Sequence, residues 1–368
     1  MIAVVGAGLM GAATAWQLAR RGHQVTLIEA YDIGHEHGSS HGSSRIFRRA
    51  YADPFYVGLT GRAAEQWREL EHDSATPLLR TTGGLDIGKG RDPAGLAAVL
   101  GAAGVRCELL SGPAAAERWP QISFEGPALY HSDAGVIDAD RAVAACVRRA
   151  VEHGADTWTG VRVTGIEVSD AVVLRTDDGR ELTADTAVIA AGAWLPGLEL
   201  PLGLPPLTVT QQQVFHFRQR EPSAAWPVLV SKDASAQVFG LPSGEDGGPL
   251  PAVKVAEHDR GTRTTATTRT GLVDPASRER VSGFVRARLP GLDPEPVAGS
   301  TCLYTTTEDD DFVLDRHGPL VIVSACSGHG AKFAPTVGAM AADLATGRAR
   351  PHPRFRLDRA ARRRTARA

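Results

Sequence analysis

The pattern of apolar and polar residues at the start of the chain predicts a strand, a helix and a second strand. IAVVGAG (residues 2–8) is a short apolar run ending in glycine, typical of a buried strand. In LMGAATAWQLARRG, which follows, apolar residues recur at helical spacing, and Gly22 ends the predicted helix. HQVTLIEA (residues 23–30) predicts the second strand. This βαβ unit of about thirty residues indicates a doubly wound, Rossmann-like sheet.

Farther along the chain the pattern is mixed. Strand-like runs such as LTVTQQQVFHFRQ (residues 207–219) alternate with glycine- and proline-rich loops. A helix is expected over residues 141–154, then a β-meander with a DDG turn that ends in the strand TAVIAAGAW. GPLVIVSACSGHGAKFAPTVGAMAADLATG predicts a buried strand, a glycine turn and a long helix. The overall class is therefore α/β with an α+β part.

Length and composition indicate a globular protein of two domains. A chain of 368 residues is too long for one ordinary core, and neither a repeat nor a low-complexity linker divides it. We therefore expect interleaved domains. Residues 1–80, 136–206 and 300–368 are assigned to a Rossmann-like cofactor domain, and residues 81–135 and 207–299 to a mixed-sheet substrate domain.

Charge and cysteine content exclude several classes of protein. A formal charge of -2 argues against nucleic-acid binding, and the basic stretch 358–368 is expected to be a frayed, solvated terminus. No apolar run is long enough to span a membrane, and the opening residues lack the basic leader of a signal peptide. The four cysteines form neither a disulfide framework nor a zinc pattern, which predicts a reducing, cytoplasmic location.

A glycine fingerprint joins the first strand to the first helix. Gly6 permits a tight turn, Gly8 lets the backbone approach a pyrophosphate, and Gly11 lets helix and sheet pack closely. Glu29, at the end of the second strand, is placed to accept hydrogen bonds from a ribose hydroxyl. This combination predicts dinucleotide binding.

Two later segments favour FAD over NAD as the dinucleotide. The strand ADTAVIAAGAW runs into Ala-Gly, which lets the chain pass close to a bound cofactor. SGHGAKF (residues 327–333) is a glycine turn opening a helix, whose amides and positive dipole end suit an electron-rich flavin carbonyl. A nicotinamide enzyme needs no such third element.

Several motifs in register carry a resemblance to a known family. VVGAGLMG, GSSHGSSRIFRRAY, RWP, VIAAGAW, CLYTTTEDDDF and SGHGAKF follow one another over nearly the whole chain. On these motifs the sequence resembles the monomeric sarcosine oxidase and N-methyltryptophan oxidase group of FAD-dependent amine oxidases, within the D-amino-acid-oxidase-like superfamily. The resemblance implies a monomer that oxidises a small secondary amino acid and reduces O2 to hydrogen peroxide.

The resemblance also assigns residues to the cofactor. It implies that Cys302 carries the flavin through a thioether, with His41 and Arg45 near the ring; a buried thiol beside noncovalent FAD is the alternative. A thiolate can add to the electrophilic methide form of an oxidised flavin, and cationic neighbours assist this. The residues expected to contact the cofactor are Gly6, Gly8, Gly11, Glu29, His41, Ser44, Arg45, Cys302, Gly328, Gly330 and Lys332.

For catalysis, the resemblance implies that Arg48 and Lys332 bind the substrate carboxylate, a task that suits a guanidinium fork and an ammonium. Lys254 is expected to stabilise developing superoxide, and His258, on the same face of one strand, to orient the amine. Tyr304 is expected to line the pocket. The alternatives are a surface ion pair for Arg48, a solvated lysine for Lys254 and an ordinary half-buried tyrosine for Tyr304.

Substrate identity stays open because Phe239 stands where sarcosine oxidases commonly place a tyrosine. The lost hydroxyl makes the pocket more apolar, so a bulkier or cyclic imino acid is an alternative to sarcosine. A flavin-binding protein without oxidase activity is a further alternative. His35, His37 and His41 lie in a glycine- and serine-rich loop that enforces no metal geometry, so we expect no metal. The acidic run 308–311 is interpreted as a solvated turn.

Overall fold

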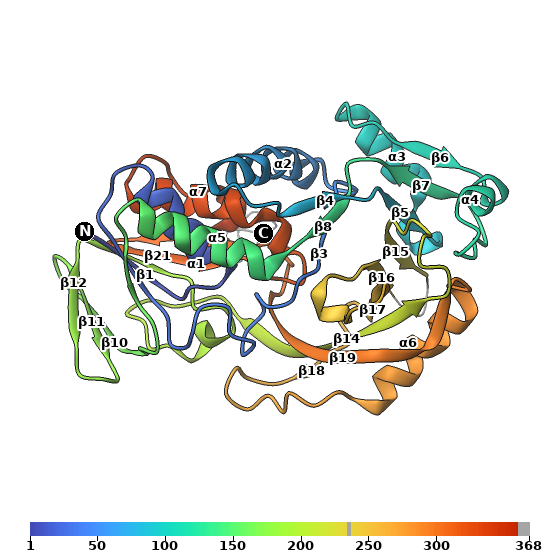
Figure 1. Cartoon of the computed structure of the whole chain (residues 1–368). Helices are drawn as coiled ribbons and strands as arrows, with labels where there is room; N and C mark the ends of the chain where they lie inside the picture. Colours follow the sequence, from blue (N-terminus) through green and yellow to red (C-terminus); the bar gives the residue numbers. More distant parts are fainter. Residues whose placement is uncertain (234–236, 360–368) are drawn as a thin grey trace, which may run out of the picture.

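The computed structural model describes residues 1–233 and 237–359, which form several sheets with helices packed against them (Figure 1). None of the helices in these ranges combines the length and the apolar character needed to cross a bilayer. The first sheet has six strands, most of them parallel, in the order β20-β21-β13-β1-β2-β9. They are β1 (Ile2–Val5), β2 (Val25–Ile28), β9 (Asp156–Trp158), β13 (Thr186–Ile189), β20 (Val313–His317) and β21 (Leu320–Ser324).

The six-stranded sheet confirms the predicted Rossmann-like fold. β1 lies in its centre and pairs in parallel with β2 and β13, and both β1 and β2 are buried along their whole length. A parallel sheet covered on both faces needs such continuous apolar strands. Only β20, at one edge, is antiparallel to its neighbour among the described strands of this sheet.

The two faces of this sheet are covered differently. Ile2 and Val4 of β1 pack into an apolar cluster with the helices, whereas Ala3 and Val5 point to the opposite face, as the two-residue period of a strand requires. α1, α5 and α7 lie together on the first face (Figure 1), and a three-stranded meander covers the second. These elements and α2 are α1 (Leu9–Ala19), α2 (Pro54–Ser74), α5 (Ala139–Glu152), α7 (Ala334–Ala345), β10 (Val163–Val168), β11 (Val172–Thr176) and β12 (Glu181–Ala184).

A larger antiparallel and mixed sheet forms the other half of the molecule in Figure 1. Its order is β18-β14-β17-β16-β15-β5-β7-β6, and β19 also pairs with β14. Helices α3 (Pro93–Ala102), α4 (Gly112–Arg118) and α6 (Pro275–Arg288) belong to this half. The strands are β5 (Gly84–Ile87), β6 (Glu108–Leu110), β7 (Ala128–His131), β14 (Leu207–Gln219), β15 (Val228–Lys232), β16 (Gln237–Pro242), β17 (Ala252–Glu257), β18 (Thr262–Arg263) and β19 (Leu292–Thr307).

A small sheet and five short 3-10 helices complete the described structure. The sheet has the order β3-β8-β4 and fixes the segment that follows the glycine-, serine- and histidine-rich loop. Its strands are β3 (Arg45–Phe47), β4 (Leu79–Thr81) and β8 (Gly135–Ile137). The 3-10 helices in the described ranges are η1 (Lys89–Arg91), η2 (Gly192–Gly197), η3 (Glu245–Gly247), η4 (Gly330–Phe333) and η5 (Pro353–Phe355).

The exact division into two domains stays a prediction. β14 and β19 pair antiparallel over nearly their whole length, from Leu207 opposite Thr307 to Gln219 opposite Leu292. β19 therefore runs across the boundary expected between residues 299 and 300. Its far end delivers Cys302 and Tyr304 to the cavity described next.

Candidate active site

A cavity of about 1200 Å³ lies where the glycine turn, the loop before β3, the strands β17 and β19 and the turn before α7 meet. This exceeds the ~300–1,000 Å³ of a typical small-ligand pocket, so it has room for a dinucleotide together with a substrate. Of the predicted site residues, all but Gly11 and His41 line it. They are Gly6, Gly8, Glu29, Ser44, Arg45, Arg48, Phe239, Lys254, His258, Cys302, Tyr304, Gly328, Gly330 and Lys332.

The glycine turn leaves no room for side chains where a cofactor backbone would approach. Gly6 has φ +96°, and a Cβ added there would lie 2.6 Å from the carbonyl oxygen of Ala190. At Gly11 an added Cβ would lie 1.7 Å from the Gly6 carbonyl oxygen, so this glycine serves helix–strand packing although it does not line the cavity. The N-terminus of α1 is thereby left open to the cavity, which fits a pyrophosphate.

Glu29 is held at the edge of the same cavity. Its carboxylate accepts hydrogen bonds from the amides of Ala7 at 2.7 Å and Tyr31 at 3.1 Å, and it lies 3.4 Å from His35 Nε2. Burial acts to raise the pKa of Glu29, but the His35 and Ala7 contacts outweigh it and hold the pKa below its ordinary value. An ionised acceptor at this place fits a ribose hydroxyl.

The histidines of the preceding loop have other contacts. His37 packs against Tyr31 with ring centroids 4.4 Å apart and the rings tilted by 37°, and His35 faces Glu29. Within residues 1–233 and 237–359, no group of three or more His, Cys, Asp or Glu side chains is arranged to hold a metal ion.

Arg45 and His41 lie near Cys302. Arg45 donates to the carbonyl oxygens of Ser44 and Ser39 at 2.9 and 3.2 Å and also to that of His41. Burial and the Arg45 charge lower the pKa of His41 to about 3, so its ring is neutral, and its buried Nε2 has no hydrogen-bond partner in the described structure. His41 lines a second, smaller cavity rather than the main one.

Cys302 is a neutral thiol in this environment. Burial raises its pKa, while Arg45 and Lys254 act in the opposite direction without reversing the shift. The predicted thiolate of Cys302 would therefore form only when a proton acceptor or a bound ligand completes the site. A second thiol, the half-buried Cys326, also lines the cavity and accepts a hydrogen bond from the Thr305 amide at 3.5 Å.

Lys254 is buried and forms an ion pair. Its Nζ lies 2.5 Å from Asp246 Oδ2 and 3.2 Å from the Ser44 carbonyl oxygen. Burial and the charge of Arg45 lower the pKa of Lys254 to about 8, against the opposing effect of Asp246. The pKa of Asp246 is about 2: burial would raise it, and Lys254 more than offsets burial. The pair is therefore charged at neutral pH.

Arg48 and Lys332 form a different kind of site. Lys332 Nζ donates to the His329 carbonyl oxygen at 2.6 Å, and Arg48 donates to that of Ala50 while its guanidinium lies 4.7 Å from the Tyr51 ring centroid. Within the described chain neither side chain forms an ion pair with a carboxylate. Burial lowers the pKa of both groups, and each lies near a second cation, Arg48 for Lys332 and Arg91 for Arg48. Asp86 acts on Arg48 in the opposite direction without forming an ion pair with it. A buried lysine beside a half-buried arginine, neither ion-paired in the described chain, fits an anionic ligand.

His258 and Tyr304 close the apolar side of this region with Phe239. The rings of His258 and Tyr304 are 5.8 Å apart, and a Cβ at Gly328 would lie 2.7 Å from each of them. Gly328, at φ +69°, is therefore required for this arrangement. Burial lowers the pKa of His258 to about 4 and raises that of Tyr304, so both side chains are neutral at pH 7.

Sequence reasoning missed several side chains of the cavity wall. Tyr51 and His329 are joined through Tyr51 Oη and His329 Nδ1 at 3.1 Å, and burial lowers the pKa of His329 to about 3. Both residues belong to motifs of the sequence: Tyr51 ends RIFRRAY, and His329 lies inside SGHGAKF. Asp246 gave no signal, because its glycine-rich loop reads as a plain turn.

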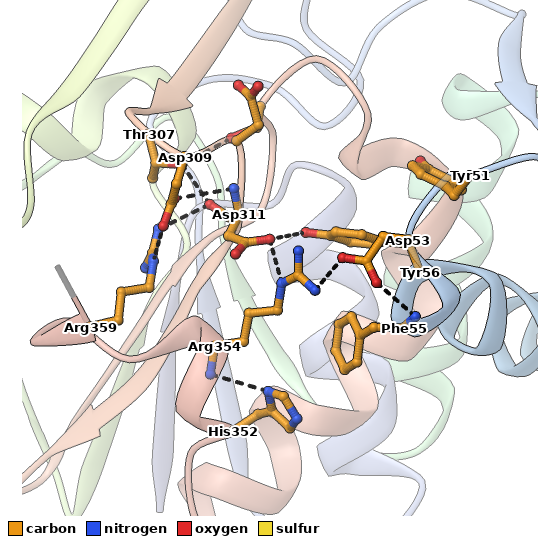
Figure 2. A network of polar contacts seen from close by, with 12 residues as sticks. Tyr51, Asp53, Phe55, Tyr56, Thr307, Asp309, Asp311, His352, Arg354 and Arg359 are labelled. Atoms are coloured by element: carbon orange, nitrogen blue, oxygen red, sulfur yellow. Dashed lines mark hydrogen bonds and ion pairs between the residues drawn. The ribbon is translucent and has the colours of Figure 1, made fainter. Parts of the chain in front are cut away.

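The acidic run 308–311 is not simply a solvated turn. The prediction was wrong for Asp309 and Asp311, which form ion pairs with distant arginines. Asp311 is only 2% exposed and accepts hydrogen bonds from Tyr56 Oη at 2.9 Å and Arg354 Nε at 2.7 Å. Arg354 also bonds Asp53 at 2.6 Å, so it joins the start of α2 to the acidic loop (Figure 2).

Arg359 corrects the prediction for the basic tail in the same way. It is buried and pairs with Asp309 at 2.8 Å, as Figure 2 shows. The rest of that stretch, 360–368, lies outside the described residues. The cause of both errors is tertiary: each arginine reaches a carboxylate far away in sequence.

Comparison with known proteins agrees with this geometry. The family model described as "FAD dependent oxidoreductase" matches residues 1–344. The chain is 34% identical over 360 residues to the peroxisomal sarcosine oxidase of Homo sapiens, covering 93% of this chain and 90% of that protein. It is 32% identical to the monomeric sarcosine oxidase of Bacillus sp. (strain B-0618), covering 94% and 91%.

A solved structure gives the same result. NikD, an unusual amino acid oxidase essential for nikkomycin biosynthesis, superposes in its open form with a TM-score of 0.86 at 28% identity, covering 97% of this chain and 96% of that chain. Family model, relatives and structure thus agree over almost the full length, and the glycine turn, Glu29 and the cavity supply a fit for the dinucleotide. The chain belongs to the FAD dependent oxidoreductase family.

Proposed function

We propose that this protein is an FAD-dependent oxidase of secondary amino acids, with N-methyl amino acids such as sarcosine as substrates. The observation that carries the proposal is a pair of cations, buried Lys332 and half-buried Arg48, which line the same cavity as the glycine turn and form no ion pair with a carboxylate in the described chain. An amino acid carboxylate supplies the missing anion. The sarcosine oxidases among its relatives support this class of substrate.

In this proposal the side chains position the substrate. Arg48 and Lys332 hold the carboxylate, which fixes the neighbouring carbon in one orientation. His258 is neutral at pH 7, so its ring can accept a hydrogen bond from the N–H of the unprotonated amine and orient it, which leaves the nitrogen lone pair free. Tyr304 and Phe239 line the cavity around the rest of the substrate and exclude water.

Bound FAD supplies the hydride acceptor for the carbon beside the nitrogen, and it passes the electrons to dioxygen to give hydrogen peroxide. Gly6, Gly8 and Glu29 would hold its adenosine and pyrophosphate part, and Gly328 and Gly330 lie in the turn before α7 whose amides would face the ring. The substrate leaves as an imine, which water hydrolyses. Lys254 provides a fixed positive charge for developing superoxide.

We infer that the flavin is attached through Cys302. Support comes from its place in the cavity wall beside Arg45 and Lys254. Acid precipitation of the holoprotein tests this: FAD should stay with the pellet in the wild type and in Cys326→Ser, and pass into the supernatant in Cys302→Ser. Release of all flavin from the wild type would rule out attachment.

We also infer a cytoplasmic monomer. All four cysteines are free thiols, which suits a reducing compartment. Size-exclusion chromatography with light scattering would test the monomer, and a dimeric mass at micromolar concentration would contradict it.

The function itself is tested with a panel of amino acids. Holoprotein is mixed anaerobically with sarcosine, other N-methyl amino acids, cyclic imino acids and their primary amine counterparts, and flavin bleaching is followed at the same time as peroxide release in air. N-methyl amino acids should bleach the flavin and release peroxide, and primary amines should not. Bleaching by cyclic imino acids alone would move the substrate class, and no bleaching by any compound would leave a flavin-binding protein without oxidase activity.

A further inference from the structure

A second cavity, of about 340 Å³, lies directly behind Lys254. Arg45, Val214, Lys254 and Cys302 line both this cavity and the main one, so these side chains form the wall between them. Most of the remaining lining residues are polar, and they include the carboxylates of Asp138, Asp140 and Asp246. A cavity of this size with several polar partners has room for water.

Asp246 occupies the junction between the second cavity and Lys254. Its side chain is 21% exposed, while that of Lys254 is only 4% exposed, so the ion pair leads from an accessible carboxylate to a buried ammonium. Asp246 Oδ1 accepts a hydrogen bond from Ser43 Oγ at 2.8 Å, and Ser43 Oγ accepts one from the Asp246 amide at 2.9 Å. This reciprocal pair fixes the carboxylate in one position.

The backbone leaves space for this contact. Gly42 has φ +94°, and a Cβ added there would lie 3.1 Å from Asp246 Oδ2 and 3.6 Å from Lys254 Nζ. His216 Nε2 lies 3.9 Å from the same carboxylate oxygen, and burial lowers the pKa of His216 to about 4, so the ring is neutral. Asp246 is therefore the carboxylate that compensates the Lys254 charge.

We propose that Asp246 is a positioning residue for the oxygen half-reaction: it fixes the place and charge of the Lys254 ammonium, and the second cavity supplies the proton that completes hydrogen peroxide. This inference rests on the proposed function. Reduction of dioxygen to hydrogen peroxide takes two electrons and two protons. A bound reduced flavin anion would supply both electrons and one proton. Water in the second cavity, next to Asp246, would supply the other proton, and the hydroxide left behind would take a proton from bulk solvent.

The charged and titratable groups facing Lys254 come from every element around it. They are Arg45 of β3, His41 of the preceding loop, His216 of β14, Cys302 of β19 and, in the lining of the second cavity, Asp140 of α5. Arg45 disfavours the charged ammonium, and Asp246 favours it. Loss of the Asp246 charge should therefore make Lys254 lose its proton at lower pH.

The test compares Asp246→Asn with Glu245→Gln in the covalently or tightly loaded holoprotein. Glu245 is the neighbouring residue of η3, carries the same charge, lines the same cavity and is directed to solvent, with 85% of its side chain exposed. Flavin reduced by light is mixed with O2 across a pH series. Photoreduction needs no amino acid substrate, so this test can fail or succeed independently of the substrate panel above.

We expect Asp246→Asn to slow reoxidation at least about 10-fold at neutral pH and to move the fall in rate with rising pH at least one pH unit lower. Glu245→Gln should change the rate less than about 2-fold. The visible spectrum of the oxidised holoprotein gives a second readout: a one-proton transition should move to lower pH in Asp246→Asn and be absent in Lys254→Met.

A double variant tests whether Asp246 acts through Lys254. In the Lys254→Met background, Asp246→Asn should slow reoxidation no further. Reoxidation at the wild-type rate in Asp246→Asn, or an equal effect of Glu245→Gln, would overturn the proposal. If Asp246→Asn fails to fold, Ser43→Ala keeps both charges and frees the carboxylate, and a shift in the same direction but smaller is expected; an unchanged pH profile would also overturn it.

Discussion

Lys254 and Lys332 line the same cavity and are both buried, yet their surroundings differ in one respect. Lys254 has a built-in counter-ion, because Asp246 lies 2.5 Å from its ammonium. Lys332 has none in the described chain; its ammonium donates to a backbone carbonyl, and the charged side chain that acts on it most is another cation, Arg48. Burial of a charge without a partner costs free energy of folding. Of these two lysines, only Lys332 lacks a carboxylate counter-ion in the described chain.

This difference separates two roles that the motifs alone do not distinguish. The Lys332 region gains its counter-ion only when an anion binds, so its charge is available for substrate recognition. Lys254 and Asp246 have no net charge as a pair, so they attract a substrate carboxylate less than the Lys332 region does. In the proposed function, the same residue type serves binding in one place and electrostatic stabilisation in the other.

The largest effect should follow from removal of the unpaired cation Arg48. Arg48→Leu should lower kcat/KM for the best N-methyl substrate by about 10³-fold, because a buried charged contact with the carboxylate is worth ~2–5 kcal/mol. The affinity of an inert carboxylate such as methylthioacetate, followed through the flavin absorbance, should fall in parallel.

Arg49→Leu is the matched control for that change. Arg49 is the next residue in the chain, but its guanidinium lies 3.7 Å from Asp133 instead of lining the cavity. A loss of less than about 3-fold is expected there. Equal losses in the two variants would show that the cation pair is not the carboxylate site.

The paired cation Lys254 should respond in the opposite half-reaction. Lys254→Met should slow reoxidation of the reduced flavin by O2 by ~10²–10³-fold, the usual consequence of losing one electrostatic contact with a developing charge. Anaerobic reduction by substrate should stay within about 3-fold of the wild type. Stopped-flow measurement of both half-reactions checks this, and equal loss in both would refute the separation of roles.

Sequence reasoning was sufficient for what lies in local pattern. The βαβ opening, the strand Leu207–Gln219 and the glycine turn follow from periodicity and from backbone conformations that only glycine adopts readily. The counter-ions were not predictable in this way. Asp246 reaches Ser43 across 203 positions and Arg354 reaches Asp53 across 301, so only the folded chain brings these groups together.

The lack of a counter-ion should also appear in stability. Burial lowers the pKa of Lys332 well below its unfolded value of 10.5. Below the folded-state pKa, Lys332 is charged in both states and its burial destabilises the fold by the full amount. Between the two pKa values the unfolded chain binds a proton that the folded chain lacks, so the penalty shrinks as the pH rises and vanishes above the unfolded pKa. Lys332→Met should therefore stabilise the substrate-free holoprotein by ~1–3 kcal/mol at pH 7 and by less near pH 10.

Thermal unfolding at both pH values measures this effect. Methylthioacetate should raise the midpoint of the wild type and leave that of Lys332→Met nearly unchanged, since the variant no longer attracts the anion. A variant less stable than the wild type at pH 7 would mean that Lys332 already has a favourable partner.

The smallest effect is expected at the edge of the substrate side, where Arg354 joins Asp53 to Asp311. Arg354→Ala should lower the free energy of unfolding by ~1–3 kcal/mol, because the buried Asp311 carboxylate loses a charged donor. Arg356→Ala is the control: Arg356 pairs with Asp358, both side chains are more than a third exposed, and such pairs contribute ~0–1 kcal/mol.

Since Asp53, Tyr56 and Asp311 line the main cavity, Arg354→Ala should also raise KM a few-fold while reoxidation by O2 stays unchanged. Slower reoxidation in this variant would show that the two sides of the cavity are mechanically coupled and that the two lysines do not act independently.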